Sequence, residues 1–188
     1  MELNGERTIP ASVDETWAAL NDPETLKACV AGCESLEKVA DDAFVAVVAM
    51  KIGPVSARFK GNLKLTNVEP PTRYTINFDG QGGVAGFGRG SADVALTALD
   101  SASTKLAYAA RATVGGKMAQ IGSRLIDATA GKITDDFFKA FEAQLQARVP
   151  GVAGVMPAAA PRERAPAGTL GWVLAAIVVA VTIFVITR

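Results

Sequence analysis

The residues that could carry acid–base or redox chemistry are two cysteines and two tyrosines, because histidine is absent from the 188-residue sequence. Without an imidazole, the chain lacks the base of Ser-His-Asp and Cys-His catalysis and a ligand that most zinc sites need. Cys29 and Cys33 are four apart at the end of a short predicted helix, on one face of it. Two thiols alone make an incomplete metal site, so we expect structural thiols, no metal and no catalytic residue. A pair of carboxylates inside a cavity would still favour an enzyme.

Six glycines between Gly80 and Gly90 invite comparison with a phosphate-binding loop. Such loops precede a helix whose N-terminus holds the anion, whereas this segment precedes a predicted strand, so we do not expect nucleotide binding. Val84, Ala85 and Phe87 give the segment an apolar tip. The tip could close over a cavity, contact a membrane interface, or be a plain glycine-tolerant turn.

Charge and composition exclude one large class of partner. The formal net charge is zero, and residues 1–150 carry 16 basic and 18 acidic side chains. A nucleic-acid-binding domain would show a basic excess or patch, so we expect no nucleic-acid partner. The N-terminus has neither the basic nor the apolar segment of a signal peptide, and two cysteines are too few for a disulfide framework. Both observations favour a cytoplasmic domain.

The sequence predicts that most of the domain is an antiparallel sheet, which would position the cysteine, tyrosine and glycine residues named above. Residues 55–65 alternate apolar and polar side chains, which is typical of a strand with one buried and one wet face. Two short helices, one through Leu20 and one from Asp22 to about residue 32, follow the first strand. The fold class is therefore α+β, with six to seven antiparallel strands. With 55–65, the strands are predicted over residues 2–10, 34–39, 43–52, 73–79, 91–99 and 105–114.

A long amphipathic helix is predicted from about residue 117 to residue 148. Its apolar side chains recur at helical spacing and need an apolar partner surface, which the inner face of a curved sheet would supply. Gly122, Ala128 and Gly131 are small where larger residues would fill a core. We therefore expect a cavity between this helix and the sheet.

The C-terminal end of the sequence predicts a membrane anchor. No charged residue lies between Arg164 and Arg188, and residues 170–187 are almost wholly apolar. A helix of that length spans about 27 Å, close to the hydrocarbon thickness of about 30 Å. We expect a domain over residues 1–149, a Pro/Ala/Gly-rich linker over 150–168 and a single membrane-crossing helix over 169–188. The anchor side chains would include Leu170, Trp172, Ile177 and Phe184.

A set of short motifs runs along nearly the whole chain in a specific order and spacing. These are residues 1–5, 22–24, 29–36, 53–55 with 59–61, 80–90 and 118–126, followed by the apolar tail. They resemble the CoxG family of carbon monoxide dehydrogenase accessory proteins, within the START-like (SRPBCC) or helix-grip superfamily. The resemblance implies a sheet gripping a C-terminal helix. It also implies a non-catalytic accessory protein that recruits carbon monoxide dehydrogenase, or a related molybdenum hydroxylase, to the cytoplasmic side of the inner membrane.

The same resemblance implies a hydrophobic ligand. Beside a membrane anchor, the expected ligand is a respiratory quinone, menaquinone or ubiquinone, with no covalently bound cofactor. A quinone is too apolar to cross water unshielded, and Tyr74 or Tyr108 could hydrogen-bond its carbonyl, although core packing is the commoner role of such tyrosines. The alternatives are an anchor with a filled core, and a general lipid-binding or cyclase-like protein. The expected cavity residues are Phe59, Leu63, Tyr74, Ile76, Phe78, Phe87, Leu96, Tyr108, Met118, Ile121, Gly122, Leu125, Phe137 and Phe141.

Overall fold

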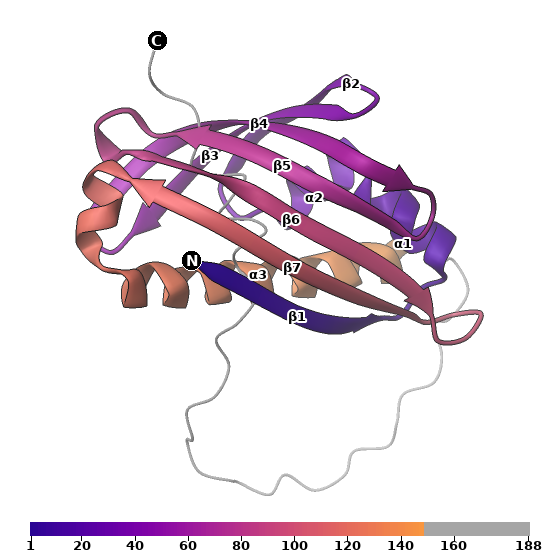
Figure 1. Ribbon diagram of the computed structural model, residues 1–188. Coiled ribbons are helices and arrows are strands. Elements are labelled where there is room, and N and C mark those ends of the chain that lie inside the picture. The colour runs from indigo at the N-terminus through magenta and orange to yellow at the C-terminus, as the bar shows by residue number, and fades with distance from the viewer. Residues whose placement is uncertain (149–188) are drawn as a thin grey trace, which may run out of the picture.

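The computed structural model describes residues 1–148, which form a seven-stranded antiparallel sheet with three α-helices (Figure 1). The expected linker lies outside the described residues. So does the expected membrane helix, with Leu170, Trp172, Ile177 and Phe184. Within residues 1–148, no helix combines the length and the apolar character needed to cross a bilayer.

The strand order across the sheet is β1-β7-β6-β5-β4-β3-β2, and each neighbouring pair is antiparallel. From β2 to β7 the strands follow one another as hairpins, whereas β1 pairs with β7, with Glu2 opposite Arg111 and Ile9 opposite Thr104. The predicted α+β antiparallel sheet is confirmed, with seven strands. Their bounds are β1 Glu2–Ile9, β2 Cys33–Ala40, β3 Ala43–Ile52, β4 Val55–Glu69, β5 Arg73–Gln81, β6 Phe87–Ala98 and β7 Thr104–Gly115.

The glycine-rich segment is more ordered than a plain loop. β5 continues to Gln81 and β6 begins at Phe87, so most of the six glycines lie in or beside strands. Between the two strands, Gly83–Ala85 forms a short 3-10 helix, η1. The segment is therefore a hairpin connection within the sheet, as its position before a strand predicted.

Two short helices, α1 (Val13–Leu20) and α2 (Pro23–Cys29), connect β1 to β2. Ser12 caps α1 through a capping box with Glu15, whose carboxylate accepts the Ser12 backbone N–H at 2.9 Å. Asp22 caps α2 by accepting a backbone N–H of its first turn. The caps supply partners for backbone donors that helices of only eight and seven residues would otherwise leave unpaired.

The long helix, α3 (Ser123–Arg148), begins later than the predicted start near residue 117. Residues Gly116–Ile121 instead form a 3-10 helix, η2, and Gly122 separates the two with a φ of +94°. That backbone conformation interrupts an α-helix, and glycine adopts it without the steric cost of a Cβ. Met118, expected on the long helix, therefore belongs to η2.

The arrangement explains the order of the elements along the chain. Figure 1 shows α3 running along the inner face of the curved sheet, with α1 and α2 near its C-terminal half. The larger core cluster joins α1 and α2 to that half of α3, including Phe137 and Phe141. A smaller cluster surrounds Phe59 and Met118. This is a sheet gripping a C-terminal helix, as the resemblance implied.

Candidate functional site

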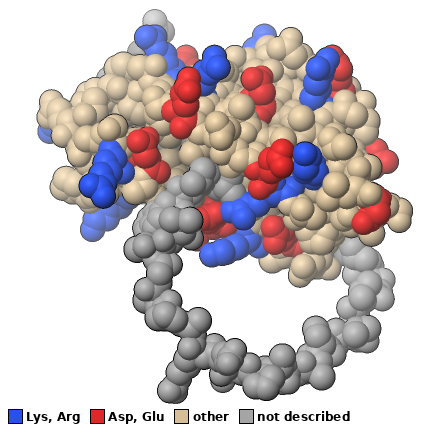
Figure 2. Space-filling view, turned by 60° about the horizontal axis from the view of Figure 1, so that its bottom comes forward, with Lys and Arg blue, Asp and Glu red and all other residues tan. Residues whose placement is uncertain are grey.

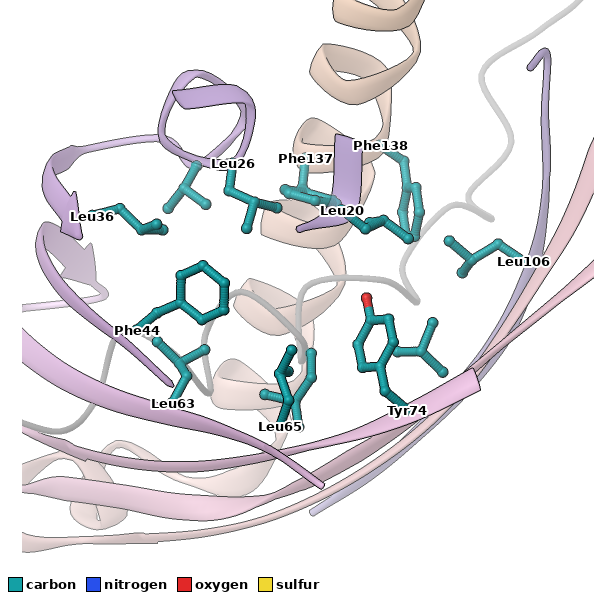
Figure 3. A pocket seen from close by; sticks show the side chains of 13 residues that line it. Leu20, Leu26, Leu36, Phe44, Leu63, Leu65, Tyr74, Leu106, Phe137 and Phe138 are labelled. Atoms are coloured by element: carbon teal, nitrogen blue, oxygen red, sulfur yellow. The ribbon is translucent and has the colours of Figure 1, made fainter. Parts of the chain in front are cut away.

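A cavity lies in the larger core cluster, between the inner face of the sheet, α1 and α2, and α3 (Figure 3). Its volume is about 80 Å³. That is room for a few water molecules, whereas pockets that enclose drug-sized ligands measure at least about 300 Å³. The sequence predicted a cavity between helix and sheet, and the structure contains one. Its wall consists of Leu20, Leu26, Val30, Leu36, Phe44, Leu63, Leu65, Tyr74, Ile76, Val94, Leu106, Phe137 and Phe138.

Among the described residues, Tyr74 carries the one polar side-chain group in that wall. Its residue is 4% exposed, and its hydroxyl points into the cavity from β5 (Figure 3). The ring packs edge-on against Trp17 of α1, with centroids 5.3 Å apart. Within residues 1–148 the Tyr74 hydroxyl has no hydrogen-bond partner. Burial raises the pKa of the phenol far above its ordinary value, so the group stays protonated and can donate.

The α1–α2 wall is held to the end of α3 by an ionic contact. Arg148, the last residue of α3, places Nη2 2.5 Å from Oδ2 of Asp22, and it also contacts the hydroxyl of Thr25. Hydrogen bonding from Thr25 and then from Arg148 lowers the pKa of the Asp22 carboxyl below its ordinary value. Because Leu20 and Leu26 flank this cap, the contact fixes the part of the wall that the two short helices supply.

Tyr108, the second candidate phenol, lies outside the cavity wall. Its hydroxyl sits over β1, where a Cβ on Gly5 would come within 1.9 Å of it. Next to it, Arg7 of β1 forms an ion pair with Asp135 of α3. Burial raises the pKa of Tyr108 to about 12. Its ring lies 6.1 Å from that of Phe138, so Tyr108 supports the wall from behind.

Four of the fourteen residues expected at the cavity line it, and three more lie close by. The four in the wall are Leu63, Tyr74, Ile76 and Phe137. The three that are buried in the same cluster without lining the cavity are Leu96, Tyr108 and Phe141. These seven residues come from the sheet and from the C-terminal half of α3, where periodicity gave the correct inward face.

The other seven expected residues do not line the cavity. Three belong to the smaller core cluster or pack against it: Phe59, Met118 and Ile121. Phe78 is buried on β5, opposite Gly90 of β6. Three are exposed: Phe87, Gly122 and Leu125. The expectation placed one cavity along the whole helix, whereas α3 lines this cavity with Phe137 and Phe138 of its C-terminal half.

Sequence reasoning missed nine residues of the wall. Leu20, Leu26 and Val30 come from the α1–α2 segment, and no periodicity in the sequence shows which face such short helices turn inward. Leu65 was detectable, since it shares the alternation of Leu63 on β4. The remaining missed residues are Leu36, Phe44, Val94, Leu106 and Phe138.

The two cysteine thiols show no sign of a reactive or metal-binding role within residues 1–148. Both cysteines are free, and burial raises the pKa of Cys29 to about 11 and that of Cys33 above its ordinary value. A thiol with such a pKa is protonated and unreactive at neutral pH. Within residues 1–148, no cluster of three or more Asp, Glu, Cys or His side chains could hold a metal ion. The described part of the cavity wall also contains no carboxylate.

Solved structures with this fold come from several organisms. A conserved protein from Geobacillus kaustophilus is 32% identical, with a TM-score of 0.74 over 78% of this chain and 96% of that one. A START superfamily protein from Mycobacterium smegmatis (13% identity, TM-score 0.64) matches over 79% and 99%, and a Streptomyces aromatase/cyclase (15%, 0.63) over 82% and 99%. The solved chains thus consist almost wholly of this domain.

A search of curated proteins gives no match. The profile of the CoxG family, described as the G subunit of carbon monoxide dehydrogenase, matches residues 5–146. That range includes every strand at least in part and nearly all of α3. The motifs noted in the sequence fall mainly within it. The chain therefore belongs to the CoxG family, on a START-like fold.

Proposed function

We propose that this chain is a non-catalytic accessory protein that binds a hydrophobic carbonyl compound, a respiratory quinone such as menaquinone or ubiquinone, for a partner enzyme. The partner is carbon monoxide dehydrogenase or a related molybdenum hydroxylase, to which the family name points. In this proposal residues 169–188 anchor the protein in the inner membrane, with the domain on the cytoplasmic side. The ligand then lies between its bilayer reservoir and the enzyme that reduces it.

One observation carries the ligand assignment: among residues 1–148, the single polar side-chain group in the wall of this apolar cavity is the Tyr74 hydroxyl, and it has no hydrogen-bond partner there. A buried donor without a partner costs free energy, which a ligand acceptor would recover. A quinone offers such an acceptor, its carbonyl oxygen, on an otherwise apolar ring. The surrounding leucine and phenylalanine side chains would contact the ring faces and the start of the isoprenoid chain.

The cavity must widen to take a quinone ring. A volume of about 80 Å³ holds only a few atoms, so part of the wall has to move. The sheet is hydrogen-bonded across seven strands, whereas α1 and α2 are short and are held by side-chain contacts such as Arg148 with Asp22. We therefore assign the opening to the α1–α2 segment, with Leu20 and Leu26 moving away from Tyr74.

The test measures quinone bound to the purified full chain. Protein in lipid nanodiscs is incubated with menaquinone, reisolated and extracted with organic solvent for mass spectrometry. We expect Tyr74→Phe to weaken binding by about five- to tenfold, the value of one hydrogen bond. Tyr108→Phe is the matched control, since it removes the chain's other phenol, which lies outside the wall. Absence of quinone from the wild-type extract would favour an anchor with a filled core. An equal loss of bound quinone in both variants would show that the Tyr74 hydroxyl does not bind the ligand.

A further inference from the structure

One end of the domain gathers three chain segments far from the cavity. It consists of the β3–β4 turn (residues 52–55), the η1 connection (83–87), and η2 with the start of α3 (116–125), together called the loop end (Figure 1). These segments pack closely: a Cβ on Gly53 would meet Leu125 and Ile121, and one on Gly116 would lie 2.5 Å from Cα of Gly86. The three segments of the loop end therefore pack against one another and form one continuous surface.

The loop end exposes apolar side chains at its edge. Val84, in η1, is 84% exposed, while Leu125 and Phe87 are 42% and 37% exposed. In residues 1–148 the other exposed large hydrophobic residues occupy three separate strand ends or turns: Val39, Val68 and Leu99. The loop end thus concentrates apolar surface that water solvates poorly.

Exposed cations lie in or beside the same chain segments. Lys51, Lys117 and Arg124 are exposed, and within the described part of the chain none of them forms an ion pair. Arg89 lies over the Phe87 ring, 5.8 Å from its centroid. Figure 2 shows this end of the molecule, at the left, with blue side chains, and red beside them, in a mostly tan surface. An anionic partner surface would complement it.

We propose that the loop end rests on an anionic lipid bilayer, with Val84, Phe87 and Leu125 entering the headgroup region. Few apolar side chains ringed by lysine and arginine are typical of a membrane-surface contact. Two of the cations are lysines, which are depleted in protein–protein interfaces. The contact goes beyond the proposed function, because it uses neither the cavity nor the expected membrane helix.

The length of the chain permits this contact together with a C-terminal anchor. Leu125 and Arg148 lie near opposite ends of α3, about 35 Å apart at 1.5 Å per residue. The 21 residues from 149 to 169 reach at most about 70 Å when extended. Both the loop end and residues 170–187 can therefore meet one bilayer, with the domain lying along it.

Vesicle binding tests the proposal without the tail. The domain of residues 1–148 is sedimented with vesicles of phosphatidylcholine alone or with phosphatidylglycerol added, at low and at high salt. We expect binding only to the anionic vesicles, released by salt. The double variant Lys117→Glu/Arg124→Glu should bind at least about tenfold more weakly, and Val84→Asp should also lose binding. Arg124→Glu places an acidic side chain in the first turn of α3, where it favours the helix.

The control variant is Lys27→Glu/Lys139→Glu, with the same charge change at exposed lysines outside the loop end. It should keep wild-type binding. Lack of wild-type binding to anionic vesicles, or equal losses in control and loop-end variants, would overturn the proposal. So would loop-end variants that keep vesicle binding but lose the partner enzyme, since the surface would then serve a protein. None of these outcomes depends on quinone in the cavity, so failure here leaves the ligand assignment standing.

Discussion

The guanidinium of Arg148, at the end of α3, lies 2.5 Å from the carboxylate of Asp22, which caps α2. The contact joins residues that are distant in the sequence and closes the α1–α2 segment over the cavity wall. Both side chains are partly exposed, so its contribution to global stability is small. Its importance lies in local opening, because the segment it holds includes Leu20 and Leu26 of the wall.

Replacing Arg148 should loosen α2 more than it destabilises the domain. We expect Arg148→Ala to lower the free energy of unfolding by less than about 1 kcal/mol. Amide exchange in α2 should quicken clearly, as should quinone uptake. Lys139→Ala is the control, an exposed cation of α3 without an ion pair in the described chain. Unchanged amide exchange in α2 of Arg148→Ala would show that the Arg148–Asp22 contact does not hold the α1–α2 segment in place.

The Asp22 cap makes stability depend on acid pH. Because Thr25 and Arg148 lower its folded-state pKa below the ordinary 3.8, the carboxylate stabilises the fold at higher pH. That contribution is lost as the pH falls through the lowered pKa. Thermal unfolding of wild type and Asp22→Asn from about pH 7 to about pH 3 should show a stability difference that narrows below about pH 4. Asparagine caps helices but does not titrate, so a difference that stays constant would argue against this linkage.

Two phenylalanines, one in the core and one in the loop end, should differ in their contribution to stability. Phe141 is fully buried and stacks on Phe137 with ring centroids 5.7 Å apart, whereas Phe87 is 37% exposed. We expect Phe141→Ala to cost about 3–5 kcal/mol and Phe87→Ala less than about 1 kcal/mol, by urea unfolding. Comparable costs would show that the hairpin tip carries part of the core. Phe87→Ala should still weaken vesicle binding.

Removal of residues 169–188 tests recruitment of the enzyme. The truncated domain should remain folded, since the described fold ends with α3 at Arg148. The partner enzyme should then leave membranes washed at high salt, which also releases the proposed loop-end contact, measured by its activity in the sedimented membranes. An internal control keeps the tail and changes only Tyr74, which should leave the enzyme on the membrane. If the enzyme stays bound after truncation, the anchor is not the recruiting element.

The sheet was predictable because its signal is local. In β4, each apolar side chain alternates with a polar one, so the inner face follows from the sequence. The glycine-rich hairpin was also assigned correctly to a strand connection. The start of α3 was not, because apolar spacing continues through Met118 and Ile121 and hides the break that Gly122 makes with its positive φ.

The cavity was only partly predictable because its position depends on tertiary packing. Leu63 and Phe137 followed from periodicity, but Leu26 reaches the wall through the cap at Asp22 and its contact with Arg148. No spacing in the sequence connects those elements. Likewise, Tyr74 and Tyr108 share an inward direction on the sheet, and only the packing of α3 places one hydroxyl in the cavity and the other beside Arg7.

The pairing of β1 with β7 has a consequence for synthesis on the ribosome. Strands β3 to β7 can each pair with the strand made just before, hairpin by hairpin. β1 can pair only after β7 has been synthesised, because Glu2 lies opposite Arg111, although Glu2 is among the first residues to leave the ribosome. Such distant pairing slows folding and leaves the early strand edge exposed to other chains meanwhile. Charged side chains on both faces of β1, Glu6 and Arg7 among them, disfavour pairing of that exposed strand edge with other chains.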